Sequence, residues 1–191
     1  MSRQEKKKTM RIPWQVSGEV RIALLTAVVL GLMAGVFSRA LEATNRTEFC
    51  VSCHSMRQNY EQYKETVHYR NRHGVAAGCP DCHVPRRFIP KLKAKVLALK
   101  DVYHEFAGTV DTPEKFEARK WELANRVWRR MKANDSQACR NCHAFDRMEL
   151  DEQDPSARRR HLRAMQTGKT CIDCHTGIAH EEPDPPDEAD G

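Results

Sequence analysis

The sequence predicts an all-α protein of low regular secondary structure, in which a single N-terminal transmembrane helix precedes a domain of short helices and loops. Three observations predict this class. An uncharged apolar run lies near the N-terminus, four copies of one cysteine and histidine motif follow it, and no stretch alternates in the manner of a strand. Aromatic residues make up only 7% of the 191 residues, which is thin for a conventional apolar core.

The apolar run covers residues 22–37 and carries no charge. At 1.5 Å per residue it spans about 24 Å, and the flanking Arg21 and Arg39 can snorkel, so we assign residues 21–41 to the transmembrane helix. Lysine and arginine dominate residues 1–20, so the positive-inside rule places these residues in the cytoplasm and the rest of the chain in the bacterial periplasm. The alternative is a secretory signal that is cleaved after the run.

All eight cysteines belong to four copies of the pattern Cys-x-x-Cys-His, the attachment signature of c-type haem. Cysteines at positions i and i+3 project from one side of a helical turn, so both can bond one porphyrin, and the following histidine can reach its iron. A disulfide framework or zinc sites would leave the four histidines unexplained. We therefore predict four covalently bound haem c groups, attached through Cys50, Cys53, Cys79, Cys82, Cys139, Cys142, Cys171 and Cys174, with His54, His83, His143 and His175 as the motif histidines.

Each half of the chain reads motif, lone histidine, motif, with His68 in the first half and His161 in the second. This repeat predicts a multihaem c-type cytochrome domain over residues 42–180, built from a duplicated dihaem unit whose core is the cofactors. Residues 181–191 carry six acidic residues and three prolines, which predicts a disordered tail.

Two longer helices should connect the motifs. The first begins at Pro90 and ends before Gly108, with one apolar face formed by Leu92, Val96, Leu99, Tyr103 and Phe106. The second begins at Thr112 and Pro113, ends at Asn134, and carries Phe116, Ala124, Val127, Trp128 and Met131 on one face.

An electron-transfer haem with six ligands needs a second axial ligand, for which imidazole is the usual choice. His68 and His161 occupy matching positions in the repeat, so we predict that both ligate iron. His180 follows His175 too closely to reach the opposite face of the same haem and should serve a neighbouring one. Met56 could replace His54 as ligand of the first haem or could simply pack against the porphyrin, and the residues alone leave this open.

The net charge and two glycines of the apolar run give expectations about binding partners and assembly. The net charge of +6 is weak support for nucleic-acid binding, because haem propionates could cancel it, and we predict no nucleic-acid partner. Gly31 and Gly35 match a helix-dimerisation face, which makes a homodimer a possible assembly.

In the order and content of its motifs the chain resembles the NapC/NirT family of membrane-anchored tetrahaem quinol dehydrogenases, and most of all its NapC-type members. This family includes the small subunit of cytochrome c nitrite reductase. The resemblance is carried by the segments Cys50 to Met56, Thr66 to Tyr69, Gly78 to Pro85, Lys132 to His143, and Cys171 to His180.

The resemblance implies electron transfer from membrane quinol (ubiquinol or menaquinol) through four haems to a periplasmic reductase or its small cytochrome subunit. Nitrate reductase in anaerobic respiration is the leading recipient. Alternatives are a nitrite, nitrous-oxide-pathway or trimethylamine-oxide-type reductase. A further alternative is a haem enzyme that reduces a small substrate at an open haem 1.

The resemblance also implies roles for single residues. Met56 would ligate haem 1, and Lys95 and Asp101 would contact the quinol beside it. Some relatives carry a histidine where this chain has Arg86, which leaves haem 1 open unless His104 substitutes. The implied distal ligands are His180 for haem 2, His68 for haem 3 and His161 for haem 4.

Overall fold

The computed structural model describes residues 17–186 and divides the chain into two units, residues 1–42 and 43–191. Most of the predicted cytoplasmic segment and the last five residues of the predicted acidic tail lie outside the described residues.

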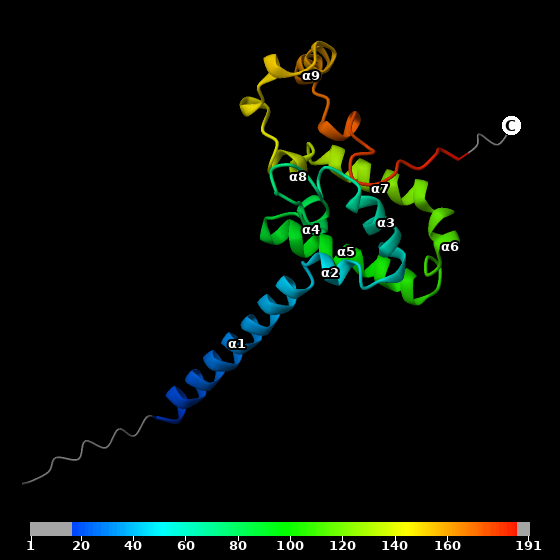
Figure 1. The fold of residues 1–191 in the computed structure, drawn as a ribbon. Coiled ribbons are helices and arrows are strands. Elements are labelled where there is room, and N and C mark those ends of the chain that lie inside the picture. Colours follow the sequence, from blue (N-terminus) through cyan, green and yellow to red (C-terminus); the bar gives the residue numbers. More distant parts are fainter. Residues whose placement is uncertain (1–16, 187–191) are drawn as a thin grey trace, which may run out of the picture. The chain divides into compact units, whose positions relative to one another are not determined.

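The first unit is formed by helix α1, Gly18–Ala43, whose last residue opens the second unit (Figure 1). Among the described residues this is the one helix long and apolar enough to cross a membrane, and none of its residues is buried. It covers the span 21–41 that we assigned to the membrane. Residues 22–37 contain neither a proline nor a charged side chain, so nothing in this run interrupts the helix.

The second unit consists of short helices joined by loops, and within residues 17–186 it contains no strand, which confirms the predicted all-α class (Figure 1). Its elements are α2 Thr47–Cys50, α3 His54–Lys64, α4 Cys79–His83, α5 Phe88–Phe106, α6 Pro113–Glu117, α7 Lys120–Ala133, α8 Gln137–Arg140 and α9 Pro155–Thr167, with the 3₁₀ turns η1 Phe145–Arg147, η2 Leu150–Glu152 and η3 Cys171–Asp173.

The two connecting helices differ from expectation in detail. Helix α5 begins two residues before Pro90, which a first turn tolerates because its N–H groups have no helical partner anyway. The second predicted helix is two helices, α6 and α7, because the backbone tightens at Arg119, whose N–H donates to the Phe116 carbonyl at 3.0 Å. This turn lets Phe116 and Lys120 both be buried.

The polypeptide encloses little apolar core by itself. Among the described residues only Tyr63, Phe116 and Ile172 are buried apolar side chains. A fully buried core residue normally touches many other apolar residues, so three such residues cannot hold a unit of this size together. The small core fits the prediction that covalently attached cofactors supply the missing apolar interior.

Each half of the chain contains a side-chain hydrogen bond that links its two motifs. In the first half the Thr47 hydroxyl accepts from the Cys79 N–H at 3.2 Å, and in the second the buried Ser136 hydroxyl accepts from the Ile172 N–H at 3.1 Å. Thr47 and Ser136 each precede the first cysteine of a motif by three residues. A hydroxyl bond therefore joins the two motifs within each half, to the first residue of the second motif in one half and to its second residue in the other, which fits the predicted duplication.

Candidate haem site

Each motif places its first cysteine on a short helical turn, at the end of α2, the start of α4, within α8 and at the start of η3. The Cys50 thiol lies within hydrogen-bonding reach of the Cys79 thiol, and Cys139 lies near Cys171. All eight cysteines are nevertheless free, so the structure forms none of the disulfides of a stapled framework.

Three of the four motif histidines face a histidine from outside the motifs. The ring centroids of His83 and His180, of His143 and His68, and of His175 and His161 are each 6.1 Å apart. A metal–imidazole bond is about 2 Å long, so two imidazoles on opposite sides of one metal ion have centroids roughly 6 Å apart. The spacing of all three pairs fits axial ligation of one iron each.

Two of the three distal histidines are oriented through their other ring nitrogen. Nδ1 of His161 lies 2.6 Å from the Gln153 Oε1, and Nδ1 of His180 lies 3.1 Å from the Asn59 carbonyl oxygen. Nδ1 of His68 is buried without a partner among the described residues. A hydrogen bond at Nδ1 fixes the ring and leaves Nε2 for a metal, as is usual for ligating histidines.

Burial keeps His83 and His180 neutral. Burial, then the neighbouring His180 and Arg130, lowers the pKa of His83 to about 4. Burial also lowers the pKa of His180. Both rings are therefore neutral at pH 7, which is the form that binds a metal ion.

The first motif is different, because no second histidine ring pairs with His54 among the described residues. His54 is exposed, and Met56 beside it is half-buried. The backbone N–H groups of His54 and Ser55 donate to Glu105 Oε1 at 2.9 and 3.4 Å, and the Ser55 hydroxyl donates to Oε2 at 2.6 Å. The Glu105 carboxylate thus caps the N-terminus of α3, where the helix dipole favours a negative charge.

The predicted quinol residues do not lie together. Lys95 Nζ donates to the Thr44 carbonyl at 2.7 Å, and its pKa is lowered by burial and raised in part by nearby Cys50, so it lies beside the first motif. Asp101, six residues further along α5, accepts from Arg126 Nη2 at 2.8 Å. Six residues correspond to about 120° around a helix, which puts the two side chains on different faces.

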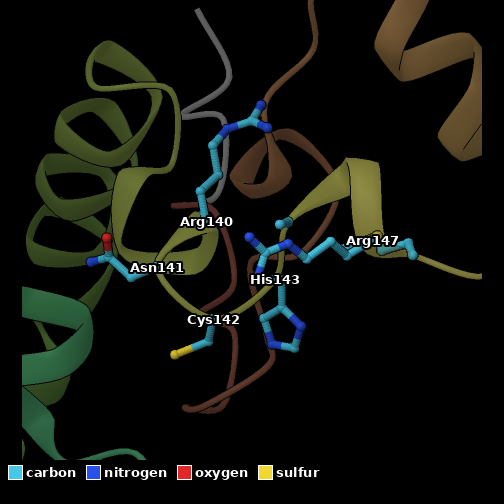
Figure 2. Close-up of a pocket in the computed structure, with 7 residues that line it drawn as sticks. Arg140, Asn141, Cys142, His143 and Arg147 are labelled. Carbon is cyan, nitrogen blue, oxygen red and sulfur yellow. The ribbon is translucent and has the colours of Figure 1, made fainter.

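A cavity of about 380 Å³ adjoins the third motif (Figure 2). Figure 2 shows the Cys142 sulfur and the His143 ring directed to the same side, with the Arg147 side chain reaching back toward this motif. Arg140 points away, because its guanidinium binds the Asp135 carbonyl and carboxylate, each at 2.8 Å. Among the described residues the Arg147 guanidinium has no ion-pair partner, so Arg147 is the cavity arginine suited to an anionic group such as a haem propionate.

Together the helical fold, the attachment motifs and the histidine pairs define a multihaem c-type cytochrome. The family model for the NapC/NirT cytochrome c family, N-terminal region, matches residues 15–185, and the chain belongs to that family. It therefore carries covalently bound haem c.

Three curated relatives match over most of their length. A putative tetrahaem cytochrome c-type protein of Allochromatium vinosum is 58% identical over 149 residues, which are 78% of this chain and 81% of that protein. The cytochrome c-type protein NapC of Escherichia coli K12 is 48% identical over 170 residues, 86% of this chain and 85% of that protein. The denitrification system component NirT of Stutzerimonas stutzeri is 49% identical over 176 residues, 89% of this chain and 88% of that protein.

Proposed function

We propose that this protein takes electrons from membrane quinol and passes them through four c-type haems to a periplasmic reductase, with nitrate reductase as the leading recipient. One observation carries the proposal. Three motif histidines have a second histidine at the spacing of axial ligands, whereas His54 has none within residues 17–186. Haems with two axial histidines suit electron transfer. The haem of the first motif lacks such a pair, and it therefore suits a position beside the electron donor.

In this proposal each motif holds one haem through its two cysteines, and the haems supply one-electron redox chemistry. His83 and His180 ligate haem 2, His143 and His68 ligate haem 3, and His175 and His161 ligate haem 4. Haem 1 takes Met56 in place of His54, because among the described residues no second histidine ring pairs with His54, whereas the equally exposed His143 and His175 each have one. His104 stays the candidate for the second ligand of haem 1, because its Nδ1 lies 2.8 Å from the Thr109 hydroxyl oxygen and its Nε2 is left for a metal.

The proposed quinol site centres on Lys95. Its ammonium is half-buried beside the first motif and is held by a single carbonyl acceptor, so it keeps donor capacity for a quinol oxygen. Quinol oxidation releases two protons, so a base must lie within reach. We propose Asp101 for this role, which requires its ion pair with Arg126 to open and its side chain to turn toward the face of α5 that carries Lys95.

The chain is proposed to sit in the bacterial inner membrane through α1, with its second unit in the periplasm. The similarity to NapC and to NirT, which is named as a denitrification system component, supports a periplasmic reductase as the class of recipient. The following experiment addresses the quinone type and the recipient, and the homodimer is proposed from Gly31 and Gly35 of α1.

The test uses the purified holoprotein in lipid nanodiscs, supplied with ubiquinol or menaquinol and with candidate reductases one at a time. We expect haem reduction by at least one quinol and reoxidation by one reductase, with nitrate reductase about tenfold faster than the others. Lys95→Met should slow haem reduction, whereas Lys169→Met, at an exposed position just after α9, should not. Failure of both quinols to reduce any haem would reject the proposal.

The unpaired His54 also favours a second candidate, an enzyme that reduces a small substrate at haem 1. Chemically reduced holoprotein without a partner should then turn over nitrite or hydroxylamine. An electron carrier would be oxidised by these substrates slowly or not at all, so one assay separates the two functions.

A further inference from the structure

Helix α5 presents an apolar face that the second unit does not cover. We call this face the α5 stripe, and it consists of Phe88, Ile89, Leu92, Val96, Leu99, Tyr103 and Phe106. These residues recur at spacings of three and four and fall within an arc of about 100° around the helix. All but the half-buried Leu92 are between 56% and 87% exposed. The apolar stripe on α7 has the same period, yet Val127, Trp128 and Met131 are half-buried by the unit itself.

The contacts of α5 with the rest of the unit arise from its other faces. Lys95 reaches Thr44, Asp101 reaches Arg126, and Glu105 reaches Ser55. None of these three residues lies within the stripe. Asp101 and Glu105 lie on the opposite side of α5 from the stripe, and Lys95 lies at the edge of the stripe, about 20° around the helix from Phe106, so these contacts leave the apolar face itself uncovered.

The charges beside the stripe are of one sign. Lys93 and Lys100 flank it, both are exposed, and neither has a partner among the described residues. The two acidic residues of α5, Asp101 and Glu105, are engaged in the contacts just described. A helix with a continuous apolar face, aromatic residues within it and lysines at its edge is the pattern of helices that lie in the membrane interface.

We propose that the α5 stripe lies against the surface of an anionic lipid bilayer, with its apolar side chains at the acyl boundary and Lys93 and Lys100 at headgroup phosphates. A bilayer is the surface at hand, because the same chain carries α1, and the proposal rests on the proposed membrane location. A protein partner would be expected to meet a polar rim of both signs, whereas the free charges here are only positive.

The test places a photoreactive benzoylphenylalanine at Phe106 or at Val96 in the full-length holoprotein, in nanodiscs of phosphatidylethanolamine and phosphatidylglycerol. The control position is Val75, which is 72% exposed in the loop before α4. After illumination we expect lipid adducts at Phe106 and Val96 about tenfold above those at Val75. Lys93→Glu with Lys100→Glu should lower the yield at Phe106, whereas Arg163→Glu with Lys169→Glu, on and beside α9, should not.

Every other outcome overturns the proposal. Adduct yields equal to those at Val75 would show that no lipid reaches the stripe. Crosslinks to a second copy would make it an interface between chains, and crosslinks to haem would make it part of the cofactor pocket. Holoprotein that does not enter nanodiscs would reject the membrane location as well, whereas incorporation without lipid adducts would reject only the role of the stripe.

Discussion

The His68 ring lies 6.1 Å from the His143 ring, although the two residues come from different halves of the chain. His83 and His180 are joined across the halves in the same way. If each pair holds one iron, the haems cross-link the two halves, and cofactor attachment becomes inseparable from folding. The near absence of an apolar core makes such cross-links necessary for stability.

Replacing a distal histidine should change one haem and spare the others. In the oxidised holoprotein, His68→Ala, His161→Ala or His180→Ala should each convert one low-spin haem to high spin, because one axial ligand is lost. Electron paramagnetic resonance measures this directly. His73→Ala is the control, since His73 is exposed and bonds only its neighbours. A His68→Ala spectrum identical to that of the parent protein would refute ligation by His68.

Glu105 should matter for the first motif alone. Glu105→Ala leaves the N–H groups of His54 and Ser55 without their acceptor, which we expect to lower the free energy of unfolding by about 1–3 kcal/mol. Glu105→Gln should recover part of that loss, and Glu122→Gln on the exposed side of α7 should have no effect. Denaturant melts measure the stability, and a redox titration should show a shifted potential for one haem. Equal shifts in several haems would contradict a role confined to the first motif.

The hydrogen bonds that link the two motifs in each half predict losses of stability that rank by the burial of the hydroxyl. Ser136→Ala removes the acceptor of the Ile172 N–H at a fully buried position, which should cost about 1–3 kcal/mol. Thr47→Val removes the equivalent bond to Cys79 at a half-buried position, so its loss should be smaller. Thermal melts of both variants, at equal haem content, provide the comparison. A larger loss for Thr47→Val would contradict the ranking by burial.

The proposed base can be tested with its ion-pair partner. Asp101→Asn should slow quinol oxidation without loss of haem, because it removes a proton acceptor. Arg126→Met removes the partner that holds Asp101 and should leave oxidation unchanged or faster. Stopped-flow haem reduction by quinol reports both. Unchanged turnover in Asp101→Asn would assign Asp101 to the surface ion pair alone.

The sequence predicted the features that repeat. The four motifs, the helical class and the matching positions of His68 and His161 are local patterns, and a duplicated pattern identifies equivalent residues without a structure. The break at Arg119 was missed, because the apolar spacing of Phe116 and the α7 stripe continues across it while the backbone tightens.

Single contacts between elements that are distant in the sequence could not be predicted either. Glu105 belongs to no motif, and only the fold brings it to Ser55. Lys95 and Asp101 look like one site in the sequence, but helical phase separates them and Arg126 of α7 claims the carboxylate. The predicted disordered tail begins with Glu181, which exchanges two hydrogen bonds with Gln62. Such pairings depend on tertiary packing and leave no local signal.

The central claim is that haem is bound through sulfur to all four motifs. Denaturing mass spectrometry of acid–acetone-extracted protein tests it most directly, with the absorbance of retained haem recorded in parallel. We predict one species heavier than the 22.0 kDa polypeptide by four haems, reduced by one haem in Cys139→Ala with Cys142→Ala. A mass equal to the bare polypeptide, with no haem absorbance retained, would contradict the account.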